Sequence, residues 1–260
     1  MKVLFIGDIV GKPGRTAVRK GIPDLVSKLK ADFVIANAEN AAGGFGITKS
    51  IGEELFSLGI DVLTSGNHIW DKKEAINYIP KENRLLRPAN YPADVPGAGS
   101  IVMKTPAGEK IAILNISGRV FMNALDCPFK TAEKEIPALK EHTPVIIVDF
   151  HAEATSEKSA IGWFLDGRVS AVVGTHTHVQ TGDEKILPKG TAFISDVGMT
   201  GPVDSIIGVK KEQIINKFLT GIPCRFETAG GESILSCVVI EINPRTGQST
   251  SIQRLQINFP

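Results

Sequence analysis

Short apolar runs alternate with amphipathic stretches over the first 70 residues, and this pattern predicts strands and helices in turn. The runs Lys2–Gly7, Asp32–Ala38 and Asp61–Ser65 are predicted strands. Apolar residues at helical spacing predict one helix over Pro13–Lys30 and a second over Thr48–Gly59, with the first residue of the second as its N-cap. This β-α-β-α-β order implies parallel strands in one sheet, joined by right-handed crossovers.

The middle of the chain begins with a short predicted helix, Lys72–Ile79, and a loop rich in Pro and Gly, Arg84–Gly99. Two further apolar runs, Ser100–Lys104 and Lys110–Ile116, are joined at Pro106-Ala107-Gly108 and predict a hairpin.

The nearly all-apolar runs Val145–Phe150 and Ala171–Val173 are short predicted strands, and a helix from about Ser156 to Leu165 lies between them. The parallel pattern therefore resumes at this point.

The remaining runs predict a second, mostly antiparallel sheet with one helix near Lys211–Phe218. Its strands are Glu184–Leu187, Ala192–Ser195, Leu235–Ile242 and Ser251–Ile257. The expected fold is of the α/β class, a four-layer α/β/β/α sandwich of two mixed sheets flanked by helices. Because no linker or low-complexity stretch interrupts the chain, we expect one domain over residues 1–260.

Composition excludes several classes of protein. The 260 residues are 42% apolar, and 29 Lys+Arg against 28 Asp+Glu give a net charge of +1. These values do not fit a disordered chain, and neither a collagen repeat nor a solenoid period is present. Without a basic block, binding of duplex DNA by bulk electrostatics is not expected, whereas a small anionic ligand stays open.

The expected location is the cytoplasm. Only five residues separate Lys2 from Asp8, which is too short for a signal peptide, and no 18-residue apolar span exists that would indicate a membrane segment. The cysteines Cys127, Cys224 and Cys237 lie far apart without a CxxC pair, a pattern typical of reduced thiols that serve packing.

Polar residues that can bind metals follow five of the predicted strands. An Asp, Glu, Asn or His in such a position is, taken alone, more often a cap, a turn former or a boundary residue. Five such ends together are an improbable coincidence, because the carboxyl ends of parallel strands form the crevice where ligands bind. The segments are Gly7-Asp8, Ala38-Glu39-Asn40, Gly66-Asn67-His68, Asp149-Phe150-His151 and Gly174-Thr175-His176-Thr177-His178.

This mixture of donors predicts a metal centre. Carboxylate and amide oxygens together with imidazole nitrogens suit Mn²⁺, Fe²⁺ or Zn²⁺ better than Ca²⁺, and the lack of thiolates argues against a structural zinc site. The candidate ligands exceed what one ion needs. Two ions sharing a bridging carboxylate would use them all, and such pairs recur in enzymes that hydrolyse phosphate esters. The seven candidates are Asp8, Glu39, Asn40, Asn67, His151, His176 and His178.

The order of these motifs resembles the calcineurin-like metallophosphoesterase superfamily, and more closely its YmdB-type bacterial branch. Two departures from the superfamily pattern, Asp8-Ile9-Val10 without a histidine and Ala38-Glu39-Asn40 in place of Gly-Asp-x-x-Asp, are similar to that branch. The resemblance covers nearly the whole chain. The segments that carry it are Gly7–Arg15, Asn37–Thr48, Ser65–Asp71, Asp149–Lys158 and Gly174–Asp183.

The resemblance implies the metallophosphoesterase fold and two divalent or trivalent ions, Fe or Mn, with Zn also open. It implies that Glu39 bridges the ions. One ion would be held by Asp8, Glu39, Asn40 and His178, and the other by Glu39, Asn67, His151 and His176.

The activity implied by the resemblance is that of a 2′,3′-cyclic-nucleotide 2′-phosphodiesterase, a hydrolase in which a metal-bound hydroxide attacks phosphorus. His68 would protonate the departing oxygen as a general acid, a role suited to a group that titrates near neutrality. The alternative for His68 is support of Asn67. The substrate would be a small cyclic nucleotide or an RNA-end phosphodiester, and the family tends to form homo-oligomers.

Three alternatives stay open at this point. The same ions can serve a phosphomonoesterase or a 3′,5′-cyclic nucleotide phosphodiesterase, and a regulatory RNA- or protein-binding factor would use them only structurally. No substrate-binding residue is assigned. The run Gly43-Gly44-Phe45-Gly46 either lets Phe45 approach a ligand or is a connecting loop with permissive glycines.

Overall fold

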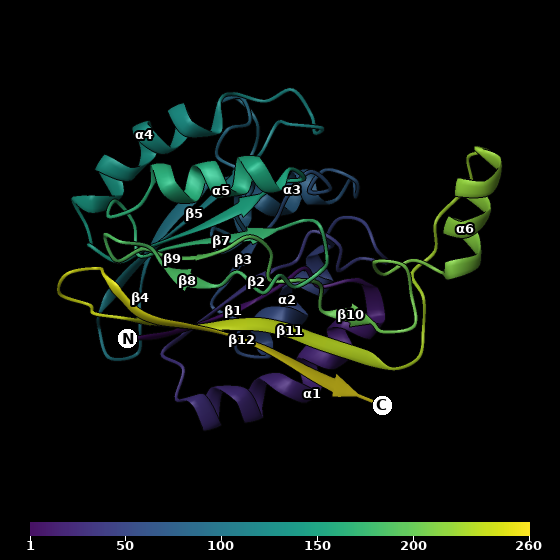
Figure 1. Ribbon diagram of the computed structural model, residues 1–260, viewed down its shortest axis with the longest axis horizontal. Helices are drawn as coiled ribbons and strands as arrows, with labels where there is room; N and C mark the ends of the chain where they lie inside the picture. The colour runs from purple at the N-terminus through teal and green to yellow at the C-terminus, as the bar shows by residue number, and fades with distance from the viewer.

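Two six-stranded sheets lie face to face in the computed structural model, which describes residues 1–260, and helices cover both outer faces (Figure 1). The first sheet has the order β10-β11-β1-β2-β3, and β12 pairs with β11. Pairing is parallel across β1, β2 and β3 and antiparallel elsewhere. Its strands are β1 (Lys2–Ile6), β2 (Phe33–Asn37), β3 (Val62–Thr64), β10 (Gly201–Pro202), β11 (Ser233–Ile242) and β12 (Ser249–Phe259).

The second sheet has the order β4-β5-β6-β7-β9-β8. Its four middle strands are parallel, and antiparallel strands flank them on both sides. The expected hairpin is confirmed as the β4–β5 pair. The strands are β4 (Ser100–Lys104), β5 (Lys110–Ser117), β6 (Ile146–His151), β7 (Ala171–Thr175), β8 (Lys185–Ile186) and β9 (Ala192–Ile194).

The helices complete the four-layer sandwich that the sequence predicts. The first two pack on the outer face of the first sheet, and the fourth and fifth cover the outer face of the second. They are α1 (Gly11–Leu29), α2 (Lys49–Ser57), α3 (Ala75–Tyr78), α4 (Pro128–Lys140), α5 (Thr155–Phe164) and α6 (Lys211–Thr220), with a short 3₁₀ helix at Ile79–Lys81. None of the helices combines the length and apolar character needed to cross a membrane.

Strand β1 shows how the layers are held together. Val3 and Phe5 point into the core between the two sheets, whereas Leu4 and Ile6 point into the core under the helices. Side chains alternate between the faces of a strand, so a strand that is apolar at every position is one that is covered on both sides. The continuous apolar run at residues 3–6 therefore marks a central strand.

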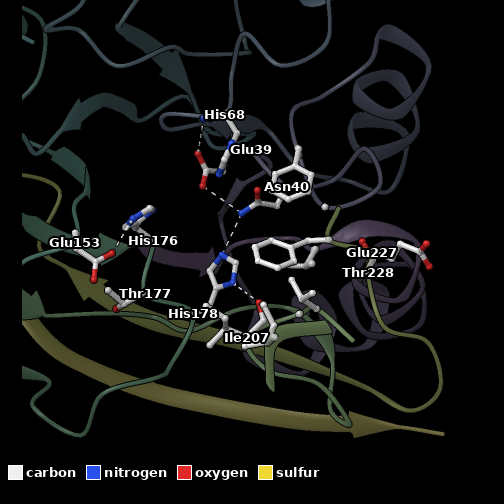
Figure 2. A pocket seen from close by; sticks show the side chains of 17 residues that line it. Glu39, Asn40, His68, Glu153, His176, Thr177, His178, Ile207, Glu227 and Thr228 are labelled. Carbon is white, nitrogen blue, oxygen red and sulfur yellow. Dashed lines mark hydrogen bonds and ion pairs between the residues drawn. The ribbon is translucent and has the colours of Figure 1, made fainter. Parts of the chain in front are cut away.

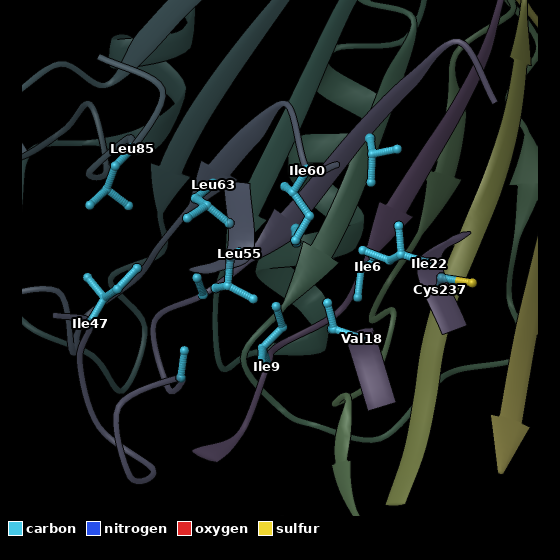
Figure 3. Close-up of a cluster of buried hydrophobic side chains, with 14 of the residues drawn as sticks. Ile6, Ile9, Val18, Ile22, Ile47, Leu55, Ile60, Leu63, Leu85 and Cys237 are labelled. Atoms are coloured by element: carbon cyan, nitrogen blue, oxygen red, sulfur yellow. The ribbon is translucent and has the colours of Figure 1, made fainter. Parts of the chain in front are cut away.

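The core beneath α1 and α2 is drawn in Figure 3. Val18 and Ile22 of α1 and Leu55 of α2 reach the same cluster as Ile6 of β1 and Leu63 of β3. All five are at most 1% exposed. This packing fixes the strands whose ends carry Asp8, Glu39 and Asn67.

The prediction of a separate C-terminal antiparallel sheet is wrong. Strands β8 and β9 extend the second sheet beyond β7, whereas β11 inserts beside β1 and carries β12. The reason lies in β11 itself. Val238 and Ile240 face the core between the sheets, while Cys237 and Val239 face the helices, so the strand requires cover on both faces.

Two helices differ from expectation. Helix α4 is not among the predicted elements, although Ala132, Ile136 and Leu139 hold helical spacing and form its buried face. Helix α3 is a single turn that continues into the 3₁₀ turn Ile79–Lys81, where Pro80 removes a backbone donor.

Helix α6 stands away from the body of the molecule (Figure 1). We call residues 206–229 the arm. Its base is a narrow neck in which Val209 forms bridges to Ile206 and Thr228. Ile214 is the only buried residue of α6, and Phe218 near its end is 84% exposed. The arm therefore has little packing of its own.

Candidate metal centre

The ends of strands from both sheets meet at one place. Asp8, Glu39 with Asn40, and Asn67 follow β1, β2 and β3 of the first sheet. The histidines come from the second sheet, where His151 ends β6 and the pair His176 and His178 follows β7. The expectation of one sheet edge is corrected accordingly. Because the two sheets face each other, the oxygen donors come from one layer and all the imidazoles from the other.

The first group of donors is Glu39, His151 and His176, whose ligand atoms all lie within 4.8 Å of one another. His151 Nε2 lies 3.0 Å from Glu39 Oε1, 3.0 Å from His176 Nδ1 and 3.1 Å from Asn67 Oδ1. A single ring nitrogen carries at most one proton, so one hydrogen bond cannot satisfy these three neighbours. A cation placed among them would satisfy all four atoms at once.

The second group is Asp8, Glu39 and His178, again within 4.8 Å. Asn40 Nδ2 lies 3.1 Å from His178 Nε2 and 3.2 Å from Glu39 Oε1. Turning the amide over presents its oxygen at the same place. Glu39 thus belongs to both groups.

Asp8 provides the sharpest test of whether the site fits a metal. Its carboxylate is fully buried, and Oδ1 has no hydrogen-bond partner, while Oδ2 accepts a bond of 3.2 Å from the backbone N–H of His176. A buried carboxylate oxygen without a partner is costly unless a cation or a proton satisfies it. The donor set and this orphaned oxygen fit a bound cation.

Electrostatics agree with that interpretation. Burial raises the pKa of Asp8 to about 6, although His178 and His151 act against it. Burial would also raise the pKa of Glu39, but the charge and hydrogen bond of His151 outweigh it and hold that pKa at about 2. Burial and the neighbouring His151 lower the pKa of His176 to about 3. His176 is thus a neutral imidazole with a free lone pair, the form that binds metals.

A buried chain of hydrogen bonds orients His151. Thr175 Oγ1 donates to Asp149 Oδ1 at 2.7 Å, and His151 Nδ1 lies 2.9 Å from the same hydroxyl. Asn37 Nδ2 donates to the other oxygen of Asp149 at 3.0 Å. Because the hydroxyl proton is used on Asp149, the N–H at Nδ1 donates to Thr175 and Nε2 is the ring nitrogen that faces Glu39. Burial would lower the pKa of His151, but the charge and hydrogen bond of Glu39 outweigh it and raise that pKa to about 9. Nε2 therefore carries a proton that a bound metal ion would displace.

The loop that carries His176 and His178 is strained. The backbone φ is 100° at His176 and 65° at His178, a region that is disfavoured for residues other than glycine. Asp196 holds the loop by accepting from the backbone N–H of Thr177 at 3.0 Å and from its hydroxyl at 2.7 Å. Lys158, which is 2% exposed, donates to the same carboxylate at 2.7 Å.

Sequence reasoning missed these supporting residues. Asp196 follows the predicted strand Ala192–Ser195, as the ligands follow theirs, and this position was a usable signal. Lys158 lies within the segment Asp149–Lys158 but had no recognisable partner. Glu153 was also missed, and its Oε2 lies 3.0 Å from His176 Nε2, which leaves Nδ1 of that ring toward His151.

His68 belongs to neither group of donors. Its backbone N–H donates to Glu39 Oε2 at 3.2 Å, and its Nδ1 lies 2.9 Å from Asp71 Oδ2. Phe45 packs against the ring, with centroids 5.1 Å apart. His68 therefore lies beside the donors, on the wall of the cavity described next.

A cavity of about 270 Å³ opens onto the donors. Glu153 and His176 lie on one side of it, Glu227 and Thr228 of the arm lie on the other, and His178 lies between (Figure 2). Gly44 and Phe45 line it as well. Of the two interpretations of that glycine-rich run, the approach to a ligand is therefore favoured over a plain connecting loop.

The sequence model of a family described as YmdB-like protein matches residues 4–255. The chain therefore belongs to the YmdB-like family. A protein of Bacillus subtilis (strain 168) named 2′,3′-cyclic-nucleotide 2′-phosphodiesterase is 52% identical over 258 residues, which cover 99% of this chain and 97% of that protein.

Two solved structures of similar proteins share this architecture. A hypothetical protein from Thermus thermophilus superposes with a TM-score of 0.94 at 40% identity and 100% coverage of both chains. A structure described as a novel phosphatase from Mycoplasma pneumoniae gives 0.93 at 37% identity, covering 99% of this chain and 93% of that one. The four-layer fold is thus shared with both of these structures over at least 93% of each chain.

Proposed function

We propose that this protein is a dinuclear metal-dependent phosphodiesterase that hydrolyses 2′,3′-cyclic nucleotides. The observation that carries the proposal is the pair of donor groups that share the buried Glu39 and open onto a cavity. The Bacillus subtilis relative, 52% identical, bears the name of that activity.

In this proposal Asp8, Glu39, Asn40 and His178 hold one ion, and Glu39, Asn67, His151 and His176 hold the other. The mixed oxygen and nitrogen donors favour iron or manganese, with zinc as the alternative. When bound, such a pair supplies Lewis-acid charge that activates water near neutral pH and offsets charge on the phosphoryl group.

The chain's own contribution to the reaction is proton transfer at His68. Its Nδ1 faces Asp71, at 2.9 Å, so Nε2 is the atom that can carry a proton to the departing ribose oxygen. Asp71 fixes the ring orientation, and Phe45 packs against the ring. An alkoxide is a poor leaving group, which is why its protonation matters.

A purely structural metal site is less well supported. Structural sites are closed by protein ligands, whereas catalytic ones keep a position open. Here Glu39, Asn40, His176 and His178 line the cavity and so lie within reach of a small molecule. A phosphomonoesterase or a 3′,5′-cyclic nucleotide phosphodiesterase would use the same ions and is separated by substrate preference.

The deciding experiment is an assay of the purified protein with Mn²⁺ or Fe²⁺ on 2′,3′-cAMP, 3′,5′-cAMP and p-nitrophenyl phosphate. We expect the 2′,3′-cyclic substrate to give the highest kcat/KM, with 3′-AMP as the product. Glu39→Gln prepared in parallel controls for contaminating phosphatases. Hydrolysis of the monoester alone would reject the proposal.

A further inference from the structure

Six of the 17 residues that line the cavity are hydrophobic. Phe45 comes from the glycine-rich loop after β2, whereas Ile207, Ile214 and Phe226 come from the arm. Val10 and Val209 complete this lining. An apolar, aromatic-lined chamber beside a phosphoester site is suited to a flat, uncharged group.

Two glycines allow Thr228 of the arm to pack closely against the body of the protein beside the cavity. A Cβ on Gly44 would lie 2.8 Å from Thr228 Oγ1, and a Cβ on Gly11 would lie 2.8 Å from Thr228 Cγ2. Both glycines also have positive φ. Thr228 Oγ1 is buried and has no hydrogen-bond partner, although the residue lines the cavity. The arm wall thus combines the apolar Ile207, Ile214 and Phe226 with the polar Glu227 and Thr228.

The charges around the cavity limit what else can bind there. None of its lining residues is a lysine or an arginine, and Glu153 and Glu227 lie at its two sides. The nearest cations are already engaged, because Lys210 pairs with Glu227 and Lys217 lies over the Phe226 ring. A second phosphate would therefore find no free counter-charge on the cavity lining. The part of the substrate that contacts the apolar residues of the arm is thus expected to be uncharged.

We infer that the arm wall binds the nucleobase of a mononucleotide substrate, with Phe226 as the residue on which the base stacks. This inference rests on the proposed function. Phe226 is favoured over Phe45 because the latter is packed against His68. Lys217 of α6 lies over one face of the Phe226 ring, its Nζ 4.7 Å from the centroid, so the base would stack on the opposite face. An aromatic face can stack on any base, so the arm wall would favour nucleotides without distinguishing one base from another.

The test compares ligands with and without a base on the Mn²⁺-loaded protein. Calorimetric titration measures binding of 3′-AMP and of ribose 3-phosphate, and steady-state kinetics compares 2′,3′-cAMP with methyl riboside 2′,3′-cyclic phosphate. We expect Phe226→Ala to weaken 3′-AMP binding and to raise KM for 2′,3′-cAMP by about tenfold, with little change on the baseless compounds. Phe226→Tyr keeps the aromatic face and should stay within about twofold of the unmodified protein.

Phe218→Ala is the matched control, because Phe218 lies on the same arm but is 84% exposed and does not line the cavity. Equal affinity of the unmodified protein for 3′-AMP and ribose 3-phosphate, or equal loss in Phe226→Ala and Phe218→Ala, would overturn the base site. Failure to hydrolyse either cyclic phosphate would instead reject the proposed function, and the binding titration would still decide the base site.

Discussion

The cavity has two walls of opposite construction. On the donor side, Asp8, Glu39 and His151 are 0% exposed and stand at the ends of strands packed on both faces. On the arm side, Phe226 and Thr228 stand on a narrow neck, and the helix that the neck carries buries only Ile214.

This difference suggests that the donor side carries the catalytic chemistry and that the arm side determines which substrate binds. Catalytic groups must be held within fractions of an ångström, which requires buried elements and redundant hydrogen bonds. A wall that only receives a base can tolerate motion, because stacking depends weakly on exact position. Substitutions on the donor side should therefore change turnover and metal content, and those on the arm side should change substrate affinity.

The largest effect is expected for Glu39→Gln. The amide keeps the size of the side chain but removes the charge shared by both donor groups. Loss of a general acid is expected to cost about 10²–10⁴-fold in rate, and the loss of activity here should be larger. Elemental analysis should show that both ions are lost. Asn40→Ala, which removes one neutral donor, is the comparison. Equal residual activity and equal metal content in the two variants would contradict the bridging role.

His68→Ala should come next. We expect both ions to be retained and turnover of 2′,3′-cAMP to fall by about 10²–10⁴-fold. The loss should be much smaller on bis-p-nitrophenyl phosphate, whose leaving group needs little protonation. Loss of metal, or an equal loss of rate on both substrates, would identify His68 as a support for Asn67 instead.

Thr175→Val tests the buried chain behind His151. The substitution keeps the shape of the side chain but breaks the link between His151 Nδ1 and Asp149. Metal affinity should fall by about 10–100-fold, as for other residues that orient a ligand. Thr191→Val is the control, because the Thr191 hydroxyl donates to the backbone of Val169, outside the metal centre. The same loss of affinity in both variants would show a general effect on stability.

The smallest effect is expected on the arm. Phe218→Ser and Leu219→Ser replace exposed side chains of α6 and should change the free energy of unfolding by no more than about 0.5 kcal/mol each. Ile22→Ala, in the core under α1, should cost about 2–5 kcal/mol. Urea denaturation measures both. A large loss of stability in the arm variants would show that the exposed face of α6 is covered in solution.

Local signals were enough to predict the donors. Asp8, Glu39, Asn67, His151 and His176 each come within three residues of the end of a predicted strand. The common direction of parallel strands then brings these ends together. The roles of these residues as ligands stay a prediction, as do the single domain and the location of the protein. The part that could be predicted from the sequence is that these five side chains lie close together.

Long-range pairings were not predictable in the same way. Strand β11 has an apolar pattern on both faces, but that pattern does not name β1 as its neighbour. Lys158 and Asp196 meet across a buried gap that neither local sequence reveals. Phe226 lies in a stretch without helix or strand, where no periodicity points to a cavity.

The neighbour of β1 has a consequence for how the protein is made. Strand β1 pairs with β11, which leaves the ribosome only about 230 residues later, at ~5–20 residues per second. Until then β1 has one unpaired edge, a feature that promotes aggregation of a nascent chain. The strand that positions Asp8 therefore gains its second neighbour only when β11 has emerged, and chaperone demand should be highest before that point.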